Sequence, residues 1–380
     1  MRRTFLAFAL LAACGGSSST SNPDAPPVVT PDAAPTADAA PPVWTAPTCT
    51  TIVGTGGVTF SRDQGATLAP TNPVLTATRY TKGLAVLDEP GRIVAGHDGT
   101  VILSLDSGCS WTSIGDTGGD SVTLTAAGLK RAYGYVDNGT TMVRIDDTTV
   151  TKLPSPGTGT ILGMAADRDN PDHVRIGDSA AQLWDSTDGG ETWAPLGVPA
   201  QANPLAYRAT FDPKDLDHVL YSTASTGALR TIDGGTHWIP STGTSSGQLG
   251  SNVFTTVFSP VDSQIAWAEG LEMVDINTNT RHVWRSTDGG ASWSVVLTQS
   301  ADLSLQNGPP IFAHPTDPNV LYVVFGMSYQ NYGTDLYRYD HATKMVTTTH
   351  NKFHRAFAID FLPTDPSFMY IGVSLEPTGG

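Results

Sequence analysis

One short pattern recurs along this chain and constrains its fold more than any other feature. A representative copy is Ser286-Thr-Asp288-Gly-Gly290-Ala-Ser292-Trp293, in which a hydroxyl residue is followed by Asp, Gly, a small polar residue and Trp at fixed spacing. We call these copies octets. Clear octets begin at residues 61, 104, 186, 231 and 286, and weaker ones that keep the Asp begin at 144 and 338. A regular step of roughly 40 to 55 residues marks a repeat array.

The residue types of the octets have a structural interpretation. An aspartate can accept hydrogen bonds from the backbone of a tight turn, glycine supplies a positive φ, and tryptophan packs against a neighbouring unit. A role for the aspartates as acids or metal ligands is the alternative, but so many equivalent copies cannot all be catalytic. We therefore interpret these residues as structural: Asp63, Asp106, Asp188, Asp233 and Asp288, with Trp111, Trp193, Trp238 and Trp293.

A second repeated element precedes the octets. Phe211-Asp-Pro213 is followed by Asp residues and the β-rich run Val219-Leu-Tyr221, and similar segments start near residues 258, 313 and 361, with a looser copy near 166. We call the Pro/Asp-rich parts Pro-turns. One unit then reads as strand, Pro-turn, strand, loop, strand, octet, strand. That is one four-stranded blade of a β-propeller.

The octets resemble the Asp-box, or BNR, repeat of bacterial-type sialidases, sortilin-type receptors, xyloglucanases and photosystem-assembly factors. The resemblance implies an all-β propeller. The segment from 51 to 68 has only the later strands of a unit, and the segment from 357 to 373 has only the first two. We therefore predict seven four-stranded antiparallel blades, with the N- and C-terminal strands sharing the closing blade, which removes free sheet edges. Six or eight blades would follow if a degenerate copy is misread.

The N-terminal residues have the pattern of a secretion signal. Basic residues precede a short apolar run, and Leu11-Ala12-Ala13-Cys14 resembles the bacterial lipobox. A plain signal peptide is the alternative. We expect a signal peptide at 1–13, a lipidated Cys14 with a disordered Ser/Pro/Ala/Asp-rich tether at 14–48, and the propeller at 49–380. The protein would then be exported and lipid-anchored to the bacterial cell envelope, with the outer membrane suggested by resemblance alone.

Two further cysteines remain if Cys14 carries lipid. Cys49 and Cys109 can pair in an exported protein, and two separate thiols are the alternative. The sequence does not show whether their Cα atoms lie within bonding reach.

The composition excludes several partners. The formal net charge is −15 with 15% charged residues, which argues against nucleic-acid binding because phosphate recognition needs a basic surface. Membrane contact is expected through the lipid anchor only.

The sequence has no His-x-x-x-His pair, Walker loop, CxxC or Gly-x-Ser-x-Gly segment, so we expect no metal and no cofactor. We expect a monomer.

The Pro-turns and octets should lie on one side of the propeller, which leaves the opposite side for binding. Loops there mix aromatic and polar residues, as a carbohydrate or peptide platform would. Ordinary solvated loops are the alternative. The residues of this expected binding face are Arg79, Tyr80, Tyr207, Arg208, Tyr329, Tyr332, His354 and Arg355.

Two functions from different classes remain open. The first is a surface-tethered binding or scaffolding propeller that recognises a glycan or an envelope or extracellular protein. The second is a sialidase-like or xyloglucanase-like glycoside hydrolase. The Phe/Tyr-Arg-Ile-Pro segment of sialidases is absent, and a xyloglucanase seats two carboxylates between two propellers, whereas this chain has one. No residue can be assigned as catalytic, and these absences favour the binding protein.

Overall fold

The computed structural model describes residues 43–54, 57–74, 81–118, 121–136, 139–157, 159–200, 205–245, 249–275, 277–326, 329, 331–352 and 354–375. The expected lipidation site Cys14 and the expected binding residues Arg79 and Tyr80 lie outside these ranges. The described residues belong to one compact unit that spans Pro42–Gly380. No segment of the described chain forms a helix with the length and apolarity needed to cross a membrane.

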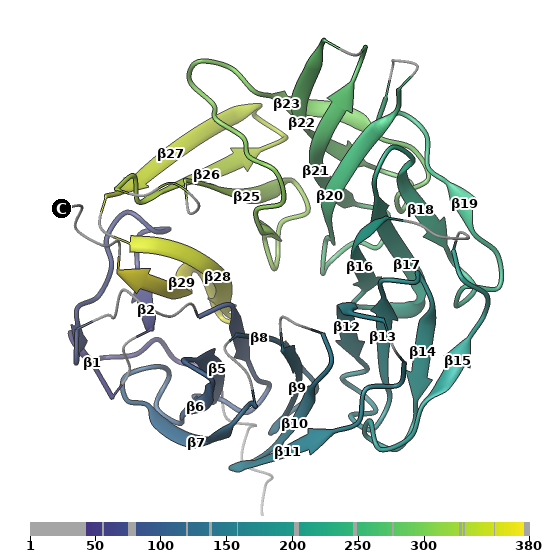
Figure 1. The fold of residues 1–380 in the computed structure, drawn as a ribbon. Helices are drawn as coiled ribbons and strands as arrows, with labels where there is room; N and C mark the ends of the chain where they lie inside the picture. Colours follow the sequence, from purple (N-terminus) through teal and green to yellow (C-terminus); the bar gives the residue numbers. More distant parts are fainter. Residues whose placement is uncertain are drawn as a thin grey trace, which may run out of the picture. The chain divides into compact units, whose positions relative to one another are not determined.

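The unit is a seven-bladed β-propeller, as predicted (Figure 1). In each of the first six blades, four consecutive strands form an antiparallel sheet. Their bounds are β4 (Gly83–Val86), β5 (Ile93–His97), β6 (Thr100–Ser104) and β7 (Thr112–Asp116) in blade 1; β8 (Val122–Ala126), β9 (Arg131–Val136), β10 (Met142–Asp146) and β11 (Thr149–Leu153) in blade 2; and β12 (Ile161–Ala166), β13 (Val174–Asp178), β14 (Leu183–Ser186) and β15 (Ala194–Leu196) in blade 3. Blades 4 to 6 comprise β16 (Ala206–Asp212), β17 (Asp215–Thr223), β18 (Gly227–Thr231) and β19 (Ile239–Pro240); β20 (Ser251–Phe258), β21 (Ala266–Met273), β22 (Asn279–Ser286) and β23 (Ser294–Thr298); and β24 (Ile311–Ala313), β25 (Val320–Phe325), β26 (Thr334–Asp340) and β27 (Met345–Asn351).

The closing blade joins the two ends of the propeller. The C-terminal strands β28 (His354–Leu362) and β29 (Asp365–Leu375) pair with each other, and β2 (Val58–Ser61) pairs with β29 in antiparallel register, Phe60 opposite Tyr370. Within the described residues this sheet has three strands, not the four expected. The chain after the first octet instead forms β3 (Thr71–Asn72), which pairs in parallel with β1 (Ile52–Val53). Pro70 and Pro73 flank β3 and carry no N–H for a sheet ladder.

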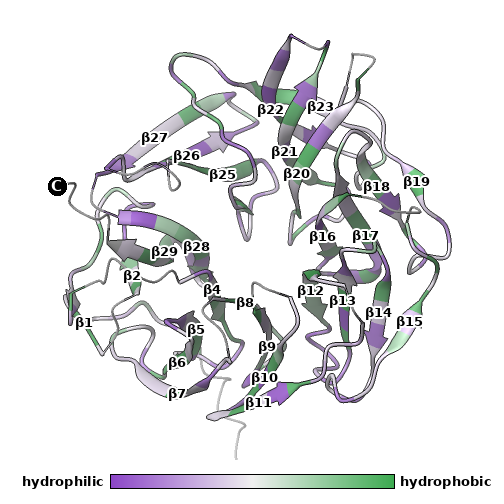
Figure 2. Ribbon diagram, viewed as in Figure 1, coloured by the Kyte–Doolittle hydropathy of each residue, from purple (hydrophilic) through white to green (hydrophobic). Residues whose placement is uncertain are grey.

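The burial of the strands explains why their sequences look as they do. All six residues of β25, Val-Leu-Tyr-Val-Val-Phe, are buried or half-buried, because a central strand of a blade is covered on both faces by neighbouring blades. The outer strand β27 is mostly exposed and polar. Figure 2 shows apolar positions on the strands of every blade. The core is therefore a series of layers between blades; one contains Trp267 of blade 5 and Leu321 of blade 6.

The topology separates the loops onto two sides. Strand pairs 1–2 and 3–4 of a blade are joined by the Pro-turn and the octet, and because the strands are antiparallel both connections lie on the same side. We call this the octet side. Strand pairs 2–3 and the links between blades lie on the opposite side, the open side. The first strands β4, β8, β12, β16, β20, β24 and β28 surround the axis of the ring (Figure 1).

Candidate functional site: the central channel and the open side

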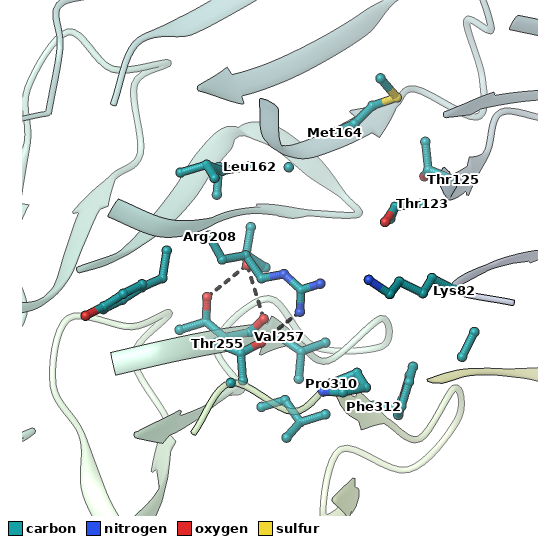
Figure 3. Close-up of a pocket in the computed structure, with 18 of the residues that line it drawn as sticks. Lys82, Thr123, Thr125, Leu162, Met164, Arg208, Thr255, Val257, Pro310 and Phe312 are labelled. Carbon is teal, nitrogen blue, oxygen red and sulfur yellow. Dashed lines mark hydrogen bonds between the residues drawn. The ribbon is translucent and has the colours of Figure 1, made fainter. Parts of the chain in front are cut away.

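A channel of about 590 Å³ runs between the first strands of the seven blades. Its described lining residues include two charged side chains, Lys82 and Arg208, and no Asp or Glu. Threonines supply most of the polar atoms, and the remaining wall is largely apolar. Figure 3 shows the Arg208 guanidinium and the Lys82 ammonium pointing toward one another across this space. The channel therefore concentrates positive charge in an acidic protein.

Four first strands carry a β-bulge that places an extra residue in the channel wall. The register shifts between Ile161 and Gly163, Ala206 and Arg208, Val253 and Thr255, and Ala356 and Ala358. A bulge leaves one residue unpaired and re-aims its side chain. The four extra residues all line the channel, and we call them the bulge collar: Leu162, Tyr207, Phe254 and Phe357.

The bulge collar holds two aromatic side chains in contact beside Arg208. The rings of Tyr207 and Phe254 have their centroids 5.0 Å apart. Arg208 Nη1 donates a hydrogen bond to Thr255 Oγ1 at 2.8 Å, which restrains the guanidinium. The two expected binding residues of blade 4 therefore belong to the channel.

Among the described residues of the channel wall there is no carboxylate pair of the kind that a glycosidase uses. One carboxyl group, that of Glu269 on β21, bonds to the channel wall. Its Oε2 accepts a 3.4 Å hydrogen bond from the N–H of the channel-lining Gly308. Glu269 is completely buried and its Oε1 has no partner in the described structure. Burial raises its pKa well above the ordinary value. A carboxyl group with a raised pKa is one of the two groups that glycoside hydrolysis needs.

A second cluster lies on the open side of blade 6. Tyr329 and Tyr332 flank Phe325, each with ring centroids 5.5 Å from it, and they are 52% and 37% exposed. Asp335 accepts a hydrogen bond from Tyr332 Oη at 2.6 Å, and His350 Nδ1 lies 2.6 Å from its other oxygen. The bond to Asp335 raises the pKa of Tyr332 to about 12, so its hydroxyl stays a donor. The two expected tyrosines form an ordered aromatic surface.

The remaining expected binding residues do not join this surface. Arg355 is only 8% exposed, so its assignment to a surface platform is corrected: the side chain is buried in the closing blade. His354 is half-buried, with Nδ1 2.9 Å from Asn351 Oδ1. The expected face thus divides into the channel of blade 4 and the cluster of blade 6.

Sequence reasoning did not single out Lys82, Glu269, Asp335, His350 or the bulge collar. One signal for the collar was present: Tyr207, Phe254 and Phe357 each stand four residues before the phenylalanine that opens a Pro-turn, Phe211, Phe258 and Phe361. Glu269 interrupts the apolar run Ala266-Trp-Ala268 of β21, and an acid that follows such a run is a sign of a buried polar group.

The octets form the same hydrogen-bonded turn five times. In the copy of blade 5, Ser286 Oγ donates to Asp288 Oδ1 at 2.7 Å and accepts from Gly290 N–H at 2.8 Å. The other end is closed by Ser292, whose N–H and hydroxyl both donate to Asp288. The same bonds centre on Asp63, Asp106, Asp188 and Asp233. Each aspartate is thus occupied by its own turn.

These bonds also shift the acidity of the aspartates. Hydrogen bonds from the Thr192 hydroxyl and N–H hold the pKa of Asp188 at about 2, and the corresponding bonds from His237 do the same for Asp233. A carboxylate that accepts several hydrogen bonds is stabilised in its charged form. Within the described residues no group of His, Cys, Asp and Glu is arranged to hold a metal ion.

The octet tryptophans differ in their surroundings. Trp111 and Trp293 are each 4% exposed, whereas Trp193 and Trp238 are half-buried. Trp238 donates its indole N–H to Val198 O of the preceding blade, while Trp111 and Trp193 donate to glycine carbonyls of their own octets. The tryptophans therefore pack the outer parts of the blades, some more tightly than others.

Cys49 and Cys109 form a disulfide, which ties the N-terminal segment to the octet of blade 1. Ahead of residue 49, Trp44 is also part of the propeller: it is 6% exposed, belongs to the core cluster of Phe60 and Tyr370, and donates its indole N–H to Leu87 O. Thr364 Oγ1 donates in turn to Trp44 O. The segment from 43 to 49 therefore fastens the two ends of the ring on the octet side.

Comparison with known proteins gives the chain a family. It is 43% identical over 336 residues to the dispase autolysis-inducing protein of Streptomyces mobaraensis, and the match covers 87% of this chain and 90% of that protein. The chain belongs to the family of the dispase autolysis-inducing protein. No family model matches it.

More distant similarities concern the fold. A xyloglucanase from Paenibacillus sp is 27% identical over 165 residues, which is 36% of this chain and 16% of the enzyme. Among solved structures, YCF48 bound to D1 peptide matches with a TM-score of 0.55 at 13% identity, covering 78% of this chain and 94% of that one. The GH74 enzyme of Niastella koreensis matches with a TM-score of 0.56 at 16% identity, covering 82% and 53%. This family member thus spans about half of a GH74 enzyme and shares its propeller architecture.

Proposed function

We propose that this chain is an extracytoplasmic binding protein whose open side and central channel engage another protein, and that the partner is a protease whose autolysis it promotes. The name of the 43% identical relative supports the choice of partner, because autolysis is self-cleavage by a protease. The observation that carries the binding role is the channel itself, which presents two cations, threonines and an aromatic collar but no carboxylate in its described wall.

A binding protein can promote autolysis without chemistry of its own. A ligand that binds an opened conformation more tightly than the closed one raises the population of the opened conformation. Proteases cleave segments that are extended and accessible, so a protease held in an opened state is a better substrate for its own kind. The exposed rings of Tyr329 and Tyr332 offer apolar area for such a segment, as interface aromatics commonly do.

The direct test is to incubate dispase with increasing amounts of the purified protein. Intact dispase is followed on denaturing gels and its residual activity is measured over time. We expect dispase to disappear faster as the protein is added, with a saturating concentration dependence. The double variant Tyr329→Ala, Tyr332→Ala should need a higher concentration for the same effect. An unchanged dispase lifetime at saturating protein contradicts the proposal.

Glycoside hydrolysis is the alternative function, and the likeness to GH74 propellers is the observation in its favour. We expect the purified protein to release no product from β-glucan oligomers or from a fluorogenic sialoside. Turnover that is abolished in Glu269→Gln would move the assignment to the hydrolase.

We also propose that the protein is anchored to the bacterial cell envelope through a lipidated Cys14, and that its partner meets it there. The lipobox-like residues 11–14 support this. Replacing Cys14 with Ser should move the protein from the membrane fraction to the soluble fraction and raise its mass by the uncleaved signal. Identical fractionation and mass for both forms would remove the anchor from the proposal.

A further inference from the structure

We propose that the channel is a binding site for the carboxylate group of a peptide, held between Arg208 and Lys82. The inference rests on the proposed function in taking a protein as the source of the carboxylate. The site itself is defined by the channel geometry, whichever protein supplies the group.

Arg208 differs in its partner from six other described arginines. Each of the six has a carboxylate oxygen within 4 Å: Arg92, Arg131, Arg144, Arg168, Arg175 and Arg338. In the described structure, the hydrogen bond made by the Arg208 guanidinium goes to the neutral hydroxyl of Thr255. A guanidinium has five N–H donors in a planar fork that matches a carboxylate. The guanidinium points into the channel toward Lys82 (Figure 3).

Lys82 adds a second positive charge aimed at the same space. It enters from the segment before β4, on the other side of the channel from β16, and its ammonium points toward Arg208 (Figure 3). Two positive charges directed into the same partly apolar cavity both attract an anion that is placed between them. The protein carries a net charge of −15, so this pair is not the result of a generally basic composition.

The surroundings of the two cations favour a carboxylate over a phosphate. Apolar side chains of the channel wall include the bulge collar and Leu84, Leu124 and Met164. Transfer from water into such a cavity costs a doubly charged phosphate more than a singly charged carboxylate. The half-buried rings of Tyr207 and Phe254 can cover an apolar side chain next to the bound carboxylate. The ligand class is thus a peptide carboxylate with an apolar neighbour.

The test uses the full protein and a pair of ligands that differ only in charge. Binding of N-acetylphenylalanine and of N-acetylphenylalaninamide is measured by isothermal titration at low ionic strength. We expect the carboxylate to bind saturably and the amide to bind at least about tenfold more weakly, because a hydrogen bond to a charged group is lost. Equal affinities for the two ligands would overturn the proposal.

Two channel variants and one matched control assign the site. Arg208→Gln and Lys82→Gln should each weaken binding of the carboxylate by about tenfold. Arg281→Gln removes the same charge from β22, where Arg281 bonds the amide oxygens of Asn307 and Gln299, and should leave the affinity within about twofold. Thermal melting verifies the fold of each variant, and Lys82→Gln carries the test if Arg208→Gln does not fold. Unchanged affinity in a folded channel variant would overturn the assignment.

Competing ligands identify the source of the carboxylate. A peptide ending in a free Phe carboxylate is compared with an amidated peptide that has an internal Glu beside Phe. Tighter binding of the first assigns a chain terminus, tighter binding of the second assigns an acidic side chain, and both support a peptide carboxylate. Inorganic phosphate that displaces both peptides at lower concentration would contradict the carboxylate preference.

The two proposals can fail separately. If dispase is lost faster in the presence of the protein but the carboxylate and amide bind alike, the channel inference fails and the proposed function stands. If the carboxylate binds through Arg208 but dispase is unaffected, the channel is an anion site and the protease partner is wrong.

Discussion

The octet side and the open side of this propeller are built from the same blades, yet they follow opposite rules. On the octet side, five turns repeat one set of hydrogen bonds around Asp63, Asp106, Asp188, Asp233 and Asp288. Toward the open side, the described residues of two blades differ: blade 4 directs Arg208 into the channel, and blade 6 carries the Tyr329 and Tyr332 surface.

The two sides differ in whether their polar side chains are used within the fold or can contact a ligand. An octet aspartate has its oxygens taken by its own turn, so it has little capacity for a ligand. Arg208 uses one N–H of its guanidinium in the hydrogen bond to Thr255, and its other N–H groups can bind a ligand. Tyr329 is half exposed. The repeated octets therefore hold the fold, whereas Arg208 and the tyrosines of blade 6, which are not part of the octet repeat, are available to a partner.

The largest expected effect comes from removing an octet tryptophan. Trp293→Ala should lower the free energy of unfolding by about 3–5 kcal/mol, because it empties a buried site in the core cluster that joins blades 4 and 5. Tyr329→Ala on the open side should change it by less than about 0.5 kcal/mol, since the side chain is 52% exposed. Chemical denaturation of both variants measures this contrast. Similar losses in the two would mean that the open side is as structural as the octet side.

An intermediate, pH-dependent effect is expected at Glu269. Its pKa is raised in the folded protein, so the folded state holds a proton that the unfolded chain releases, and stability falls as the pH rises above the ordinary pKa of about 4.3. Glu269→Gln should match the wild type at pH 4 and be more stable at pH 8 by about 1–3 kcal/mol, the order of a poorly satisfied buried polar group.

The matched control for Glu269 is Glu191→Gln on the octet side. Glu191 is 61% exposed and pairs with Arg144, so its loss should cost at most about 1 kcal/mol and confer no gain at pH 8. Urea unfolding at the two pH values separates the variants. A Glu269→Gln protein with no gain at high pH would show that Glu269 is ionised in the folded state.

The smallest effect is expected from the charge of a single octet. The pKa of Asp188 is lowered to about 2, so its contribution to stability is present above the ordinary value of about 3.9 and is lost as the pH falls toward 2. Asp188→Asn should lower the melting temperature at pH 7 and flatten its decline between pH 4 and pH 2. Asp302→Asn, in an open-side loop, should follow the wild type. An Asp188→Asn curve parallel to the wild type would contradict the hydrogen-bonded carboxylate.

Much of the fold could be predicted because the residues that form each turn are close together in the sequence and the pattern is repeated. The octet brings its hydroxyl, Asp and Gly into one turn of eight residues, so the sequence suffices to recognise it. The closing blade followed from incomplete units at the two ends, although the proline-flanked β3 left that blade with three strands in the described chain. The pairing of Cys49 with Cys109, which the sequence left open, depended on where the N-terminal segment crosses blade 1.

By itself the sequence determined the repeating blade and predicted seven of them, because each octet and Pro-turn is formed by residues that are neighbours along the chain. Only the tertiary structure decided which side chains meet. Arg355 and Arg208 stand in similar polar and aromatic surroundings in the sequence, but packing of the closing blade buries the first and a bulge next to Tyr207 turns the second into the channel. Lys82 lies far from Arg208 along the chain, and the two face each other only because the blades close into a ring around one axis.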